Sequence, residues 1–284
     1  MRLLIGINVC VDASWCSRHL SGYRGAASGN TPNLSRFKVA RLLHLARIRG
    51  IVKISIATSS SVNDALSEKL ATRLGLERCI VVNTTGGAQA AREQVAAAAA
   101  RALPSLIKEG DLVGLSWSRT VESMVDMLTE LPRCSVVQLA GSFSTTHGDA
   151  LDLVHRAARL SGGSAYALHA PLVVDDPAVA RALRRQPGIA DTLQIADDVD
   201  VSVVAVGAWR SGCSTVWDAV TPTVQKAGIR AGAVGEVIGR LVGADGASIE
   251  SPLDHLVVSA SLNQLKRPAQ RIALVSGPHR AVST

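Results

Sequence analysis

The sequence has few aromatic residues, no long apolar run and no cysteine pair at metal-ligand spacing. Only 3% of its 284 residues are aromatic although 47% are hydrophobic, which indicates an α/β protein rich in alanine, valine and leucine. No apolar run approaches the length of a membrane span, so we expect no membrane contact. The cysteines are odd in number and scattered, which predicts free thiols in a reducing cytosol, a cytoplasmic location and no metal site. They are Cys10, Cys16, Cys79, Cys134 and Cys213.

Acidic residues are missing from one long stretch near the N-terminus. Between Asp12 and Asp64 there is no aspartate or glutamate, while eight lysines and arginines stand there. The net charge of the chain is +7, so the rest of it holds one more acid than base. A local excess of positive charge is typical of a surface that contacts the DNA backbone. A solvated helix face is the alternative, but the complete lack of acids favours DNA.

The acid-free stretch contains a helix and strand pattern typical of a DNA-binding module. Ser35 is a good N-cap, and apolar residues recur behind it at helical spacing until Gly50. Residues 51–56 then read as a short strand. A basic helix, a glycine and a β-ribbon form the back half of a winged helix-turn-helix, whose helix enters the major groove. The residues expected at the DNA are Ser35, Arg36, Phe37, Lys38, Arg41 and Lys53.

A serine-rich joint at residues 59–62 separates this module from the rest of the chain. We therefore predict a winged helix-turn-helix region at 1–58 and a second domain at 59–284. In the second domain strands alternate with helices, which predicts a parallel sheet covered on both faces. The expected helices are 63–74, 88–103, 121–131, 150–160 and 176–185, and the expected strands are 79–82, 112–115, 135–139, 164–168 and 201–206.

Loops rich in glycine and hydroxyl residues stand beside the predicted strands, at residues 84–87, 114–120, 138–142 and 207–215. In open parallel sheets, ligands bind beyond the carboxyl ends of the strands, where the strand order reverses. Small residues, hydroxyls and free N–H groups at a helix start suit a phosphate. Any single loop is equally an ordinary turn, but several together indicate a site of sugar-phosphate size. No GxGxxG follows a first strand, so the dinucleotide fingerprint is absent.

Eight segments of the chain match segments of a known protein family and follow one another in the same order as in that family. They are LSRFKVARLL (34–43), RGIVKISI (49–56), VGLSWSRTV (113–121), QLAGS (138–142), YALHAPLVVDDP (166–177), VGAWRSGCSTVWDAV (206–220), AGAVGEVIGRLVGADG (231–246) and SGPHRA (276–281). Together they resemble the SorC/DeoR-type bacterial transcription regulators. The resemblance implies a winged helix-turn-helix and a Rossmann-like, sugar-binding effector domain related to sugar-phosphate isomerases. It also implies homo-oligomers, dimers or tetramers, whose binding to operator DNA changes when a phosphorylated sugar binds.

The resemblance further implies a set of effector-binding residues. The hydroxyls and the arginine at 116–120 match the phosphate-side loop, where the family usually has glycine at Ser118. Glu236 matches an acidic position suited to sugar hydroxyls, and Arg280 retains a cation where the family tends to place a lysine, without Schiff-base chemistry. Trp117 either stacks on a sugar or packs within its loop. The full set is Ser116, Trp117, Ser118, Arg119, Thr120, Gln138, Gly141, Glu236 and Arg280.

Two regions depart from the family pattern. Residues 1–33 lack its first helices, and the chain ends at Thr284, where the family continues through one more helix and strand. These departures leave one alternative open, a paralogue that binds a sugar phosphate but not DNA. The other alternative is an isomerase-type enzyme, but the loops offer no His–carboxylate pair for acid/base work. We therefore predict a sugar-phosphate-responsive, DNA-binding transcriptional regulator of carbohydrate metabolism, with no catalytic residues, cofactor or metal.

Overall fold

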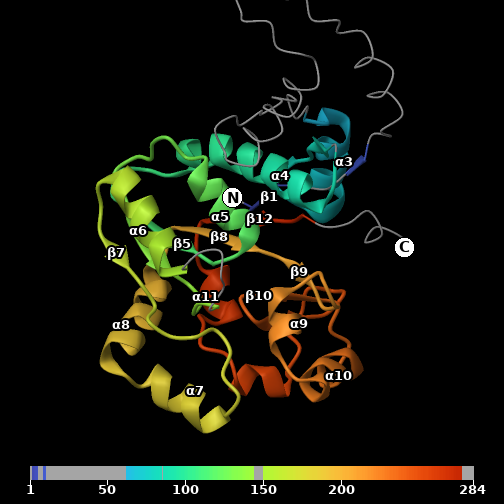
Figure 1. The fold of residues 1–284 in the computed structure, drawn as a ribbon. Coiled ribbons are helices and arrows are strands. Elements are labelled where there is room, and N and C mark those ends of the chain that lie inside the picture. The colour runs from blue at the N-terminus through green and yellow to red at the C-terminus, as the bar shows by residue number, and fades with distance from the viewer. Residues whose placement is uncertain (1, 6–8, 11–61, 85, 144–149, 277–284) are drawn as a thin grey trace, which may run out of the picture. The chain divides into compact units, whose positions relative to one another are not determined.

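The computed structural model describes residues 2–5, 9–10, 62–84, 86–143 and 150–276, drawn as a coloured ribbon in Figure 1. The chain divides into two compact units, one of residues 1–11 and 61–284 and the other of residues 12–60. The second unit lies outside the described residues, and so do the predicted recognition helix and ribbon within it. All the described residues belong to the larger unit.

Seven described strands form one sheet in which every neighbouring pair runs parallel. From one edge to the other they are β3 (Arg78–Ile80), β1 (Arg2–Ile5), β12 (Gln270–Leu274), β8 (Val201–Ala205), β5 (Leu112–Leu115), β6 (Ser135–Gln138) and β7 (Ala165–Tyr166). Alternate residues of single strands join different cores, with Val136 in one and Val137 in the other. The predicted parallel sheet buried on both faces is thus confirmed.

The five helices predicted between the strands are present. They are α3 (Asp64–Leu74), α4 (Ala88–Ala102), α5 (Arg119–Asp126), α6 (Ala150–Ser161) and α7 (Pro177–Arg184). Local chemistry explains their ends: Asn63 Oδ1 accepts from Leu66 N at 3.0 Å at the start of α3, and Gly75 ends it with φ 61°. Helix α5 begins two residues before the predicted start at 121, because Ser118 caps it, and it ends at Asp126 instead of 131.

The larger core lies between the sheet and helices α4, α5 and α6. Helix α4 contacts β1, β12 and α5. Its buried residues are Val95 and a series of alanines, whose small side chains let the helix approach the sheet and α5 closely. In Figure 1 these three helices lie on one side of the sheet, while α8 (Pro187–Ile195) and α11 (Leu262–Lys266) lie on the other.

A smaller antiparallel sheet follows β8 and was not predicted. Its strands are β9 (Gly207–Ala208), β10 (Gly235–Val237) and β11 (Arg240–Val242), and it is accompanied by α9 (Thr215–Ala219), α10 (Pro222–Arg230) and η4 (Pro252–His255). The turn between β10 and β11 has two residues of positive φ, Ile238 at 49° and Gly239 at 78°. Two such residues form the hairpin turn whose twist matches that of the strands.

Strand β1 corrects the predicted domain division. Residues 1–58 were assigned to the DNA-binding region, but Arg2–Ile5 lies in the sheet between β3 and β12. The predicted boundary at residues 58 and 59 falls outside the described residues and stays a prediction. The remaining elements are β2 (Val9–Cys10), β4 (Asn83–Thr84), η2 (Leu103–Leu106) and η3 (Ala196–Asp198).

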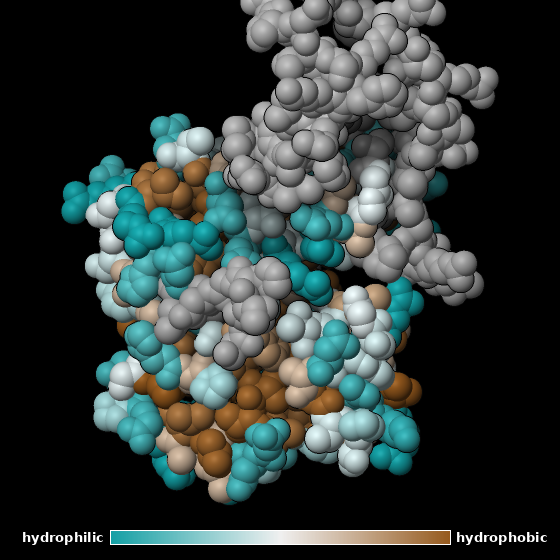
Figure 2. All heavy atoms as spheres, viewed as in Figure 1, coloured by the Kyte–Doolittle hydropathy of each residue, from teal (hydrophilic) through white to brown (hydrophobic). Residues whose placement is uncertain are grey.

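Hydropathy varies over the face seen in Figure 2. In that view, hydrophobic residues gather on the lower part of the face, in the region where Figure 1 shows α7 and its neighbours. Val179 of α7 is one exposed apolar side chain, and Ile229 and Val234 are others in the described chain. Exposed apolar surface of this kind is a common feature of contact surfaces between proteins.

Candidate functional site

Hydroxyl side chains meet at the carboxyl edge of the parallel sheet. Thr120 Oγ1, in the first turn of α5, shares a hydrogen bond of 3.1 Å with Ser276 Oγ, which follows β12. Ser116, directly after β5, donates its N–H to Val203 O at 3.0 Å, and its Oγ accepts from Ala205 N at 3.3 Å. The carboxyl ends of β5, β8 and β12 are thereby joined through polar groups.

The strand order reverses at this point of the sheet. From β5 the chain proceeds outward through β6 to β7, and it returns as β8 on the other side of β5. Ligands of open α/β sheets bind at such a switch point. The predicted phosphate-side loop therefore stands at the position where this architecture places a ligand.

Ser118 is the N-cap of α5, and the start of this helix favours an anion. Its Oγ accepts from Val121 N at 3.0 Å, which satisfies one of the N–H groups that open the helix. The N–H groups of the first turn that have no intrahelical partner, together with the helix dipole, favour a negatively charged group at this end. Arg119, the first helical residue, is exposed and adds a positive charge to the same turn.

Glu236 lies in the small sheet close to the end of β8. Its carboxylate is buried and accepts hydrogen bonds from Ser214 Oγ at 2.9 Å and from Gly239 N at 3.0 Å. Burial raises the pKa of the Glu236 carboxyl, and the bonds from Gly239 and Ser214 offset part of that rise. A carboxylate oxygen has two lone-pair sites, so Glu236 keeps acceptor capacity beyond these two bonds.

Gln138 and Gly141 hold the backbone around the site. Gln138 is buried, its Nε2 donates to Ala140 O at 2.7 Å, and its Oε1 accepts from Leu168 N at 3.1 Å. A Cβ on Gly141 would lie 2.6 Å from Ala170 O. These contacts give both residues a scaffolding role, and a direct contact of either with a ligand stays a prediction.

Trp117 packs against its surroundings. Its ring meets Phe143 edge to face, with centroids 5.8 Å apart, and contacts the larger core. The indole Nε1 is buried and has no hydrogen-bond partner among the described residues. Of the two roles left open by the sequence, these contacts favour packing within the loop.

Known proteins match most of this chain. Residues 60–284 match the family described as “Putative sugar-binding domain”. The chain belongs to this family. One relative, the deoxyribonucleoside regulator of Bacillus subtilis, is 26% identical over 257 residues, which cover 89% of this chain and 82% of the relative. Another, the sorbitol operon regulator of Klebsiella pneumoniae, is 24% identical over 258 residues, or 86% of this chain and 80% of the relative.

Solved structures share the fold of this sugar-binding domain. A DeoR family transcriptional regulator from Listeria monocytogenes superposes with a TM-score of 0.67 at 23% identity, covering 75% of this chain and 86% of that one. The full-length sorbitol operon regulator SorC from Klebsiella pneumoniae gives 0.66 at 20% identity, covering 84% and 79%. The family match and the named relatives confirm the resemblance to SorC/DeoR-type regulators, and the structural likeness confirms the fold.

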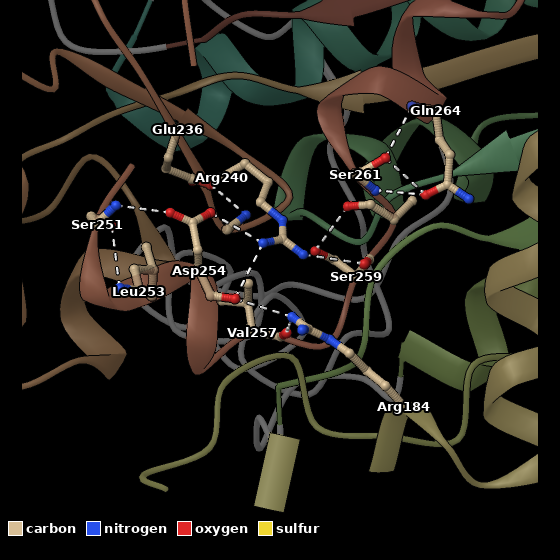
Figure 3. A network of polar contacts seen from close by, with 12 residues as sticks. Arg184, Glu236, Arg240, Ser251, Leu253, Asp254, Val257, Ser259, Ser261 and Gln264 are labelled. Atoms are coloured by element: carbon tan, nitrogen blue, oxygen red, sulfur yellow. Dashed lines mark hydrogen bonds and ion pairs between the residues drawn. The ribbon is translucent and has the colours of Figure 1, made fainter. Parts of the chain in front are cut away.

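A network of polar contacts joins the small sheet to α7 and η4 (Figure 3). Arg240 Nη1 pairs with Asp254 Oδ1 at 3.1 Å, and Arg184 Nη2 donates to the backbone oxygens of Asp254 and Val257. Burial and the charge of Arg240 lower the pKa of the Arg184 guanidinium. Asp254 and Val257 belong to the segment 252–260, which these arginines hold in place. The same segment contacts the loop after β6, where Gly141 N donates to Val258 O at 2.9 Å.

Several residues of the site were missed by sequence reasoning. Ser276 and Ser214 stood inside segments that carry the resemblance, but a serine near a turn gives no signal that separates a ligand contact from a cap. Arg184, Arg240 and Asp254 are far apart in the sequence, so their meeting depends on the tertiary fold. The residues predicted to contact DNA, from Ser35 to Lys53, and the predicted effector residue Arg280 lie outside the described residues.

The described residues form neither a metal-binding cluster nor a membrane-spanning helix. No group of three or more His, Cys, Asp or Glu side chains within those ranges is placed to hold a metal ion. No helix in the described part of the chain is long and apolar enough to cross a membrane.

Proposed function

We propose that this chain is a transcriptional regulator whose sugar-binding domain takes a phosphorylated sugar as its effector. The observation that carries the proposal is the meeting of Ser116, Thr120 and Ser276 with the open first turn of α5 at the switch point of the sheet. Hydroxyls and free N–H groups at a helix start are the partners a phosphate requires. The relatives compared are named as regulators and not as enzymes, which supports regulation over catalysis.

The two ends of the effector would meet different chemistry. The phosphate would lie at the first turn of α5, where Ser118 and Thr120 stand with Arg119. The sugar hydroxyls would reach toward Glu236 and Ser214, because β9 brings Glu236 next to the end of β8. A carboxylate beside a hydroxyl suits a ligand that presents several O–H donors.

DNA contact and self-association complete the proposal. The acid-free stretch between Asp12 and Asp64, with its eight lysines and arginines, would supply the operator contacts. The domain would associate with further copies of the chain through apolar surface such as that gathered on the lower part of the face in Figure 2. A homo-oligomer would present two basic modules to a symmetric DNA site.

One titration tests these assignments. The purified chain is added to the DNA upstream of its own gene at low and moderate salt, with and without a panel of pentose and hexose phosphates. We expect a sequence-selective complex that weakens as salt rises and that one sugar phosphate changes in affinity. Arg36→Ala and Arg41→Ala should each weaken the complex and reduce its salt dependence. A folded protein without any selective complex would instead favour a paralogue that binds the effector but not DNA.

A further inference from the structure

Arg92 continues the buried stripe of α4 at the end where the helix begins. Val95, Ala96 and Ala99 follow it at the i+3, i+4 and i+7 positions, and all three are buried. Arg92 itself is half-buried. Because helical side chains lean toward the N-terminus of their helix, we expect the guanidinium to lie toward the first turn of α4.

The start of α4 lies near the candidate site. Helix α4 follows β3 and β4 in the chain, packs on β1 and β12, and contacts α5. Ser276 follows β12 and bonds to Thr120 in the first turn of α5. An arginine on the buried stripe that leans toward the start of α4 is therefore directed to the carboxyl edge on which these hydroxyls lie.

Arg92 has a second cation beside it and no ion-pair partner in the described part of the chain. The charge of Arg119 is close enough to lower the pKa of the Arg92 guanidinium, in addition to the larger lowering by burial. Neither side chain has an ion-pair or hydrogen-bond partner within the described ranges. The neighbouring Glu93 opposes the lowering only in part, and its carboxylate accepts from Gln89 Nε2 at 3.0 Å.

The other half-buried arginines of the domain all have partners among the described residues. Arg240 and Arg156 form ion pairs with aspartates, and Arg184 and Arg271 donate hydrogen bonds to backbone carbonyls. An arginine that is partly removed from water next to another arginine, without a paired carboxylate, is destabilised by both effects. An anion bound between the two guanidinium groups would offset both the lost hydration of Arg92 and the repulsion between the two positive charges.

We propose that Arg92 and Arg119 together bind the phosphoryl group of the effector, between the first turns of α4 and α5. This inference rests on the proposed function, because it identifies the cations that would meet the phosphate at the same site. A guanidinium presents paired N–H donors that match phosphate oxygens two at a time. Arg92 thus favours phosphorylated over unphosphorylated forms of the same sugar.

Binding titrations with matched variants test this assignment. The probes are inorganic phosphate and a panel of sugar phosphates, each with its unphosphorylated sugar. The variants are Arg92→Gln, Arg92→Lys and, as control, Arg181→Gln, which removes the same charge from an exposed position on α7. Circular dichroism and thermal unfolding establish that each variant is folded, and calorimetry gives the dissociation constants.

We expect Arg92→Gln to raise the dissociation constant of the bound sugar phosphate about ten- to a hundredfold, as for the loss of a charged hydrogen-bonding partner. Arg92→Lys should give a smaller rise, because lysine keeps the charge and loses the paired donors. Arg181→Gln should bind as the wild type does. If an unphosphorylated sugar binds the wild type, its dissociation constant should be the same in Arg92→Gln.

The outcomes separate this inference from the proposed function. If a sugar phosphate binds the wild type and Arg92→Gln equally well, the role of Arg92 is overturned and the proposed effector class stands. If inorganic phosphate binds in an Arg92-dependent manner while no sugar phosphate binds, the anion site stands and the effector class fails. If the wild type binds neither probe, both are overturned.

Discussion

Glu236 lies directly against Gly207, so closely that a Cβ on the glycine would stand 2.7 Å from Glu236 Oε1. The two residues are also paired in register between β10 and β9. Since β9 begins two residues after the end of β8, this pairing holds the buried carboxylate close to the carboxyl edge of the parallel sheet. Because residue 207 is a glycine, Glu236 can approach the backbone of β9 this closely, and the two sheets can join at the candidate site.

Gly207→Ala should destabilise the domain and weaken effector binding. The added Cβ would meet Glu236 Oε1 and would lie 3.2 Å from Cys213 O, so the carboxylate must leave its bond with Ser214. Overpacking of this kind costs about 1–3 kcal/mol of unfolding free energy. Urea denaturation measures it. Gly188→Ala is the matched control, because a Cβ there meets nothing within 4 Å, and equal losses in both variants would contradict the prediction.

Glu236→Gln should change how stability depends on pH. Burial raises the pKa of the Glu236 carboxyl, so ionisation is harder in the folded chain than in the unfolded chain, where the pKa is about 4.3. The contribution of Glu236 to stability is therefore full below about pH 4 and is lost as pH rises through the folded pKa. Glutamine does not ionise, so the stability of the variant relative to the wild type should increase with pH.

Urea titrations of both proteins at intervals between about pH 4 and pH 8 check this sign. Circular dichroism follows unfolding, and the difference in unfolding free energy is plotted against pH. A difference that stays constant over this range would show that Glu236 ionises as easily in the folded chain as in the unfolded chain, contrary to its burial.

Gly141→Ala should cost stability for a different reason. The added Cβ would lie 2.6 Å from Ala170 O and from the carbonyl carbon and oxygen of Pro171, which are backbone atoms and move only with the chain. We expect a loss near the upper end of the usual range for overpacking, about 3 kcal/mol, in urea denaturation. If the variant instead kept its stability and lost sugar-phosphate affinity, Gly141 would border the ligand, and the scaffolding role would be wrong.

The parallel sheet was predictable because its signals are local. Strands such as 112–115 and 135–138 are short apolar runs, and helices of the same domain start at capping residues such as Asn63 and Asp176. The same alternation places the hydroxyl loop at 116–120 at the carboxyl edge of the sheet. The order of the strands, and with it the switch point, depends on the tertiary fold.

The parts that were not predicted depend on contacts between distant residues. Strand β1 joins the sheet through β12, which stands at the other end of the chain. The small sheet has strands of two or three residues, too short for a periodic pattern, and its hairpin rests on Ile238, a β-branched residue in an unusual positive-φ conformation. The sequence gives no sign of a binding role for Arg92, because an arginine in an alanine-rich helix is an ordinary helix former. Its closeness to Arg119, a residue that the sequence does predict, depends on the packing of α4 against α5.

Arg184 and Arg240 should be energetically coupled through Asp254. Both donate to the backbone oxygen of Asp254, Arg184 at 3.1 Å and Arg240 at 3.3 Å, and Arg240 also pairs with its carboxylate. Removing either guanidinium leaves buried oxygens with fewer donors, so Arg184→Met and Arg240→Met should each cost about 1–3 kcal/mol. Because the remaining arginine still donates to the shared carbonyl, the loss in the double variant should differ from the sum of the two single losses by about 0.5 kcal/mol or more.

A double-mutant cycle in urea measures this coupling. Arg185→Met is the matched control, since Arg185 is the next residue along the chain and its side chain is exposed. It should lie within about 0.5 kcal/mol of the wild type, as is usual for surface positions. Losses that add within error would mean that the two arginines hold separate parts of the 252–260 segment. In that case the segment would not act as one clamp between α7, the small sheet and the loop after β6.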